Sequence, residues 1–128
     1  MKDLLLKWAE LETESRCRLN DGCIEFRIGD ERLIQVYVDP LVDYPPEVFA
    51  CIQLGVQEAL AHRQWHFHLD SGEESADGSF NFQACIFAPD PDSHGDFSYT
   101  AVSAIAAESL LSAYVQALEA VEVEEEAA

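Results

Sequence analysis

The basic residues of this 128-residue chain end early, and Arg63 is the last of them. Residues 64–128 contain thirteen acidic side chains and no lysine or arginine, whereas residues 1–63 contain twelve acids and seven bases. The two parts therefore carry charges of −13 and −5, which add to the −18 of the whole chain. A half without counter-charge repels itself on folding, and it repels nucleic acid and anionic membranes. This charge distribution favours a basic protein partner or cations, and it argues against direct nucleic-acid binding.

Length and composition predict one folded domain over residues 1–121, followed by an acidic flexible tail over 122–128. An apolar content of 48% is too high for a wholly disordered acidic protein. No apolar run approaches the roughly 20 residues that span a bilayer, and the first residues do not read as a signal peptide. We therefore expect a cytoplasmic protein that is not embedded in a membrane. The four cysteines form no C-x-x-C pair, so we expect reduced structural thiols.

Periodicity in the first part predicts a helix, a hairpin and a second helix. Leucines and Trp8 recur at helical spacing over 3–14, and apolar residues alternate over 23–28 and 33–38 around a Gly29-Asp30 turn. A short strand over 16–19 is also possible. Pro46 suits the first turn of a helix over 46–62 that is apolar almost all round. Such a helix is either enclosed in the core or shared with a second subunit.

The second part predicts strands over 65–69 and 79–87, a loop over 88–97 and a final helix over 98–121. The resulting order is α-(β)ββ-α-ββ-α. Antiparallel hairpins with helices on one face give an α+β two-layer sandwich, and we expect one sheet of four to five strands.

The sharpest local motif is His66-Phe67-His68-Leu69-Asp70, whose polar members share one face of a strand. It resembles the H-x-H-x-D motif of metallo-β-lactamase-type hydrolases, but Ser71 stands where that family has a further histidine. A metal or small-ligand site at His66, His68 and Asp70 is therefore one hypothesis, and a strand whose polar side meets solvent is the simpler interpretation.

Other candidate chemistry is weaker still. The segment 90–95 starts like a calcium-binding loop, but Ala101 occupies the twelfth position, where a bidentate carboxylate is required. No phosphate-binding loop or nucleophile motif is present in the sequence. We therefore expect no enzyme activity and no cofactor.

The element order, size and acidity resemble those of the type III secretion chaperones and the YbjN-like proteins, which are small acidic α-βββ-α-ββ-α domains. The matching stretches are the opening helix at 4–9, the hairpin start at 21–26, the middle helix before Trp65, the hairpin at 79–87 and the helix at 102–118. The resemblance implies a non-enzymatic protein that holds a partner protein on a dimeric scaffold. It also implies that the dimer pairs through the middle helix, here at Phe49, Ile52 and Val56.

A partner's extended apolar segment would then lie on apolar patches of the first helix and the sheet. Leu33, Tyr37 and Phe87 are the apolar members of an otherwise polar sheet face, and on an open sheet they would form such a patch. The alternative interpretation is that they are scattered surface hydrophobes.

The charge supports a different function. Small acidic cytosolic domains can block the basic nucleic-acid groove or active site of a target, as DNA mimics, phage counter-defence (anti-CRISPR) proteins and immunity proteins do. An acidic surface that serves only solubility is a further alternative. The carboxylates that would serve such an inhibitor are Glu73, Glu74, Asp77, Asp90, Asp92 and Asp96.

Overall fold

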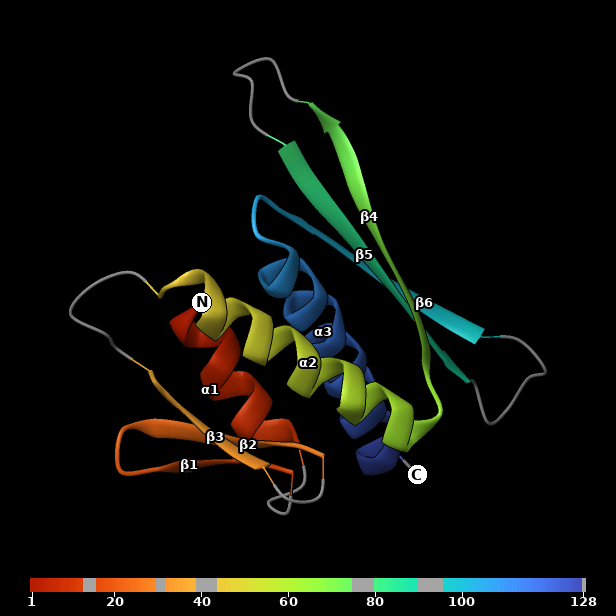
Figure 1. Ribbon diagram of the computed structural model, residues 1–128. Helices are drawn as coiled ribbons and strands as arrows, with labels where there is room; N and C mark the ends of the chain where they lie inside the picture. The colour runs from red at the N-terminus through yellow and green to blue at the C-terminus, as the bar shows by residue number, and fades with distance from the viewer. Residues whose placement is uncertain (13–15, 30–31, 39–43, 75–79, 90–95, 128) are drawn as a thin grey trace.

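The computed structural model describes residues 1–12, 16–29, 32–38, 44–74, 80–89 and 96–127 (Figure 1). The side chains of 72–74, 80, 96 and 122–127 are outside this description. The described residues form three helices and two three-stranded antiparallel sheets. Their bounds are α1 Lys2–Leu11, β1 Cys17–Asn20, β2 Cys23–Ile28, β3 Arg32–Tyr37, α2 Pro46–Arg63, β4 His66–Glu74, β5 Phe80–Pro89, β6 Asp96–Ser103 and α3 Ala106–Ala127.

The three helices lie between the two sheets (Figure 1). Sheet A has the order β1-β2-β3 and packs against α1 and α2, whereas sheet B has the order β4-β5-β6 and packs against α3. Helix α3 also contacts α1 and α2, so it connects the two halves of the molecule. Each sheet therefore buries one face and leaves the other uncovered by any described element.

The α+β class is confirmed, but the prediction of one sheet with four to five strands is wrong. The chain forms two separate sheets because each apolar sheet face is covered by its own helices. The weakly predicted strand near 16–19 is real and pairs with β2, so sheet A gains a third strand.

The missed element is β6. The sequence predicts a loop and the start of the final helix from Asp96 onward, yet this segment pairs with β5 over eight residues. Its side chains alternate, with Tyr99 and Ala101 half-buried toward α3 and with Ser98 and Thr100 exposed. Aromatic and β-branched residues in this alternation favour a strand. Helix α3 consequently begins at Ala106, and it continues to Ala127, through most of the segment predicted as a flexible tail.

Helix α2 confirms the predicted boundaries within one residue, since it runs from Pro46 to Arg63. Its buried face packs against α3 and β2, whereas Leu54 on the other side is exposed. Ile52 and Val56 are fully buried there, which corrects their prediction as dimer contacts: neither presents surface to a second subunit. Phe49 is half-buried and meets the ring of Tyr44 edge-on at 5.9 Å.

Two glycines shape the contact between α2 and sheet A, one through its backbone conformation and the other through its lack of a side chain. Gly29 adopts a φ of +69° in the β2–β3 turn, and its backbone N–H donates to the carboxylate of Glu58 on α2. Gly55 lies in the middle of α2, where a Cβ atom would stand 2.5 Å from the Phe26 ring and 3.1 Å from the Trp8 ring. Trp8 and Phe26 pack with their ring centroids 5.0 Å apart and are fully buried. The absence of a side chain at position 55 is therefore a packing requirement.

We predict that Gly55→Ala destabilises the protein, although alanine favours helix by about 1 kcal/mol over glycine. Overpacking against two buried rings costs roughly 1–3 kcal/mol and outweighs this gain. Chemical denaturation of the two proteins measures the difference. Leu54→Ala, at an exposed position of the same helix, serves as the control and is expected to change the unfolding free energy by less than about 0.5 kcal/mol. A Gly55→Ala protein more stable than wild type would contradict the packing described here.

Candidate functional site

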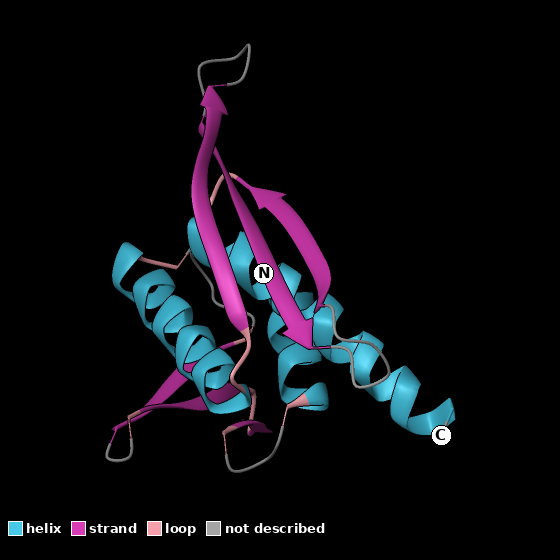
Figure 2. Ribbon diagram, turned by 90° about the vertical axis from the view of Figure 1, so that its right-hand side faces the viewer, coloured by secondary structure: helices cyan, strands magenta, loops and turns pink. Residues whose placement is uncertain are grey.

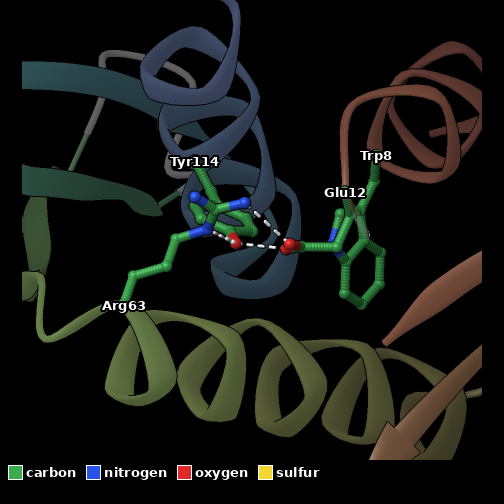
Figure 3. A network of polar contacts seen from close by, with 4 residues as sticks. All are labelled: Trp8, Glu12, Arg63 and Tyr114. Atoms are coloured by element: carbon green, nitrogen blue, oxygen red, sulfur yellow. Dashed lines mark hydrogen bonds and ion pairs between the residues drawn. The ribbon is translucent and has the colours of Figure 1, made fainter. Parts of the chain in front are cut away.

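The most connected polar cluster lies between the helices (Figure 3). It consists of Trp8 from α1, Glu12 at the C-terminal cap of α1, Arg63 at the end of α2 and Tyr114 from α3, and it is called here the interhelical network. Arg63 Nη2 donates to Glu12 Oε1 at 2.9 Å, and Arg63 Nε donates to the Tyr114 hydroxyl at 3.0 Å. The Tyr114 hydroxyl and the Trp8 indole N–H both donate to Glu12 Oε2. Three helices are thereby joined through one carboxylate.

Local structure places each member of the interhelical network. The backbone N–H of Glu12 caps α1 by donating to the carbonyl of Trp8, one turn earlier. Gln64 adopts a left-handed conformation with a φ of +61° and ends α2 directly after Arg63, as at many helix C-termini. The Arg63 guanidinium then lies over the ring of Trp65 at 5.1 Å, a cation–π geometry.

Burial and the neighbouring charges shift the pKa values of Tyr114 and Arg63 in the interhelical network. Burial raises the pKa of Tyr114 well above its usual range, and the neighbouring Glu12 raises it further, so the hydroxyl remains a donor. Burial alone would lower the pKa of Arg63, but Tyr114 and Glu12 outweigh it and raise that pKa. Burial followed by the charge of Glu12 likewise raises the pKa of the Cys17 thiol. The polar groups of the network bond to one another, and these bonds join α1, α2 and α3.

Sequence reasoning did not identify the interhelical network. The available signals were the Trp8–Glu12 spacing of one helical turn and the position of Arg63 as the last base in the chain. Tyr114 gave no signal, because tyrosine in an apolar helix is typical of a core residue.

The outer face of sheet A is the most distinctive exposed surface. Strand pairing places eight side chains on it, since directly opposed residues in antiparallel strands share a face. Tyr37 and Leu33 are 71% and 46% exposed there. The members of this face are Arg18, Asn20, Cys23, Glu25, Arg27, Leu33, Gln35 and Tyr37.

Glu25 occupies the middle strand of this face and is only 3% exposed. Asn20 Nδ2 donates to Glu25 Oε1, and Arg18 Nη2 approaches Glu25 Oε2 at 3.4 Å. The hydrogen bond from Asn20 is the main cause that lowers the pKa of Glu25; burial opposes it, and Arg18 and Gln35 contribute further lowering. At the end of the face, the Tyr44 hydroxyl donates to the backbone carbonyl of Tyr37. The face is therefore a fixed polar scaffold that carries exposed Tyr37 and Leu33.

Phe87, the third predicted member of the apolar patch, lies elsewhere. It is on β5 in sheet B, so the prediction that it shares one face with Leu33 and Tyr37 is wrong. Two separate sheets replaced the single predicted sheet, and Phe87 instead packs edge-on against the His68 ring at 5.6 Å.

The outer face of sheet B carries the His66, His68 and Asp70 side chains, all three exposed, as the alternation predicted. Cys85 lies opposite His68 on β5, and the Thr100 hydroxyl approaches its sulfur at 3.5 Å. Among the residues whose positions are described, no group of three or more His, Cys, Asp or Glu side chains converges to hold a metal ion. The geometry therefore gives the metal hypothesis no ligand cluster within this part of the chain.

The structure describes only some of the acidic residues on which the inhibitor hypothesis rests. Asp77, Asp90 and Asp92 lie outside the described residues, whereas Glu73 and Glu74 belong by their backbone to β4 and Asp96 to β6. In the described part of the chain no helix is both long and apolar enough to cross a membrane.

Comparison of the chain with protein-family models, with curated proteins and with solved structures finds no match. The resemblance to secretion chaperones therefore stays a prediction, and functional reasoning starts from the surfaces themselves.

We predict that Arg63→Met costs roughly 3 kcal/mol of unfolding free energy, because it leaves the buried Glu12 carboxylate without its cation. Adding Glu12→Gln to this variant removes the uncompensated charge and recovers part of the loss, so the two substitutions are non-additive. Denaturant titration of the single and double variants measures this coupling, with Lys7→Met on the exposed side of α1 as control. Additive effects would show that the pair does not join the helices.

We predict that Asn20→Ala raises the pKa of Glu25. The pKa of Glu25 is lower in the folded protein than its ordinary value of 4.5. The charged side chain therefore stabilises the fold at pH values above 4.5, and this stabilisation is lost as the pH falls through the folded-state pKa. The variant should therefore unfold at a higher pH than wild type in an acid titration, and carbon NMR of the Glu25 carboxyl measures the pKa directly. Gln83→Ala on sheet B is the control, and an unchanged Glu25 pKa in Asn20→Ala would refute the assignment.

Proposed function

We propose that this protein is a non-enzymatic binding protein that holds a partner protein against the outer face of sheet A. The observation that carries this proposal is the exposure of Tyr37 and Leu33, at 71% and 46%, on one face of a regular sheet. Exposed single hydrophobes are common on protein surfaces, but these two lie on the same strand and face, four residues apart with Gln35 between them.

The chemistry around these two residues supports binding to protein. Tyrosine and arginine are the residue types that dominate the binding energy of protein interfaces. On this face Arg27 lies opposite Leu33, and Arg18 lies on β1, on the far side of Glu25 from β3. Both arginines are exposed in a chain of charge −18. The outer face of sheet A is therefore far less acidic than the chain as a whole, so a partner of either charge can approach it.

Preorganisation supports the proposal further. Glu25 is fixed beneath the face by Asn20 and Arg18, and the backbone at Tyr37 is held by Tyr44. Binding to such a face costs little backbone ordering, so burial of Tyr37 and Leu33 contributes directly to affinity. The mechanism is that of a holding chaperone or adaptor in the cytoplasm: an apolar segment of the partner is covered until it is released.

We predict that Tyr37→Asp and Leu33→Asp each abolish capture of the partner while leaving the fold intact, because both side chains are exposed. Tagged wild-type and variant proteins are incubated with lysate of the source cells at moderate and high salt, and the bound proteins are identified by mass spectrometry. Leu54→Asp is a matched control, since Leu54 is 47% exposed but lies on α2. The proposal requires a protein that wild type and Leu54→Asp retain at both salt concentrations and that the sheet A variants lose. Equal capture by all four proteins would overturn it.

A second candidate function rests on the charge alone. The half of the chain after Arg63 has thirteen acids and no base, which fits an inhibitor that occupies a basic nucleic-acid-binding or active site on its target. Such an association is screened by salt, with a Debye length near 8 Å at physiological ionic strength. A partner lost at high salt from every variant, and lost also after charge reversal at Glu73, Glu74 and Asp77, would support the inhibitor over the chaperone.

A further inference from the structure

Strand β6 forms one edge of sheet B. It pairs with β5 through eight consecutive residue pairs, and among the described strands it has no neighbour on its other side. In Figure 2, β6 is the right-hand strand of the sheet, and no described helix or strand runs alongside its outer edge. An edge of this length presents backbone groups to any extended chain that approaches it.

The edges of β1 and β3, both in sheet A, are modified in ways that natural proteins use to prevent strand addition. Strand β1 has four residues and carries Arg18. Strand β3 begins with Arg32, and at its end the Tyr44 hydroxyl occupies the carbonyls of Tyr37 and Val38. Short length, charge and side-chain coverage each hinder pairing with a further strand.

The two edge strands of sheet B, β4 and β6, differ in how well they are protected against strand addition. Strand β4 carries exposed Asp70, and its pairing register shifts between Ser71 and Glu74. Strand β6 has no register shift, and its sequence from Phe97 to Ser103 contains no charged residue and no proline. Its one charged residue, Asp96, stands at the first position. Among the edge strands that the structure describes, β6 therefore has the longest uncharged stretch with regular pairing.

The chemistry of an occupant follows from charge. Sheet B and α3 belong to the half of the chain that carries −13, and β6 itself begins with Asp96. Asp70 on the opposite edge strand β4 and Glu119 on α3 are exposed. A second copy of the chain brings the same negative field to the edge and is repelled. An extended segment with lysines or arginines around an uncharged centre matches both the neutral strand and the acidic surroundings.

We propose that the edge of β6 accepts a basic extended segment of a partner protein as a fourth strand of sheet B. Backbone hydrogen bonds would supply the affinity, as in other β-strand additions. Exposed Val102, on the outer face, and Phe97, on the face toward α3, would flank the added strand with apolar surface, since they are 62% and 43% exposed. This site is separate from the outer face of sheet A and does not depend on the function proposed for that face.

The test uses the full chain labelled with nitrogen-15 and the synthetic peptide Lys-Arg-Val-Thr-Val-Thr-Val-Arg-Lys. The expected result is a set of amide shifts concentrated in β6, with hydrogen exchange of β6 amides slowed at least tenfold by the peptide. Val102→Lys adds the kind of edge charge that blocks strand addition, and it should weaken binding at least tenfold. Leu19→Lys, at a 53% exposed position on the edge strand β1, should leave binding unchanged.

Two further measurements keep the proposal falsifiable without relying on any variant. A peptide methylated on alternate backbone nitrogens retains its charge but cannot pair with a strand, so it should not bind. Equal binding of the methylated peptide, or shifts spread over the acidic surface instead of β6, would reduce the association to simple charge attraction and overturn the proposal. If hydrogen exchange of the β6 amides slows when the protein is concentrated without peptide, a second copy of the chain is the occupant, and the proposal is overturned. Tyr37→Asp should bind the peptide like wild type, which separates this test from that of the proposed function.

Discussion

The contact between Arg63, Glu12 and Tyr114 determines how the two halves of this molecule are assembled. Arg63 is the last base in the chain, and it neutralises a carboxylate that is only 2% exposed at the junction of the three helices. A buried carboxylate without a cation is strongly destabilising, so this pair stabilises the junction of the three helices. Tyr114 brings α3 into the same contact, and α3 in turn supports sheet B. The acidic half thereby becomes attached to the half that contains the bases.

This assembly leaves two sheets with their outer faces uncovered by described elements and with different chemistry. The outer face of sheet A combines Tyr37 and Leu33 with arginines and a fixed carboxylate. The outer face of sheet B combines Val102 and Phe87 with histidines, Asp70 and uncharged polar residues. Because α1, α2 and α3 fill the space between the sheets, the functional surfaces are faces and edges of strands. Such surfaces suit protein recognition, in which rigid backbone and a few exposed anchors provide affinity.

The sequence predicted elements well where one periodicity dominated. Alternation over 23–28 and the proline at the start of α2 predicted β2 and α2 almost to the residue, because local pattern and tertiary packing agree there. Strand β6 was missed because its alternating segment runs into an apolar helix after only two intervening residues. The dimer residues Ile52 and Val56 were misassigned because an all-round apolar helix looks the same whether α3 or a second subunit covers it.

The candidate site was predictable only in part. The exposure of Leu33 and Tyr37 followed from strand alternation, but the separation of Phe87 from them depends on which strands pair, and pairing is a long-range property. Likewise, the burial of Glu25 on an outer face needs Asn20 and Arg18 from the neighbouring strand, which no local pattern reveals.

The most direct test of binding at the outer face of sheet A is photocrosslinking inside the source cells, with a benzophenone amino acid placed at position 37. The expected result is a covalent adduct between this protein and one partner protein, with no such adduct when the same group replaces Leu54 on α2. Adducts of equal yield from both positions, or none from position 37, would contradict the assignment of this face as the binding surface.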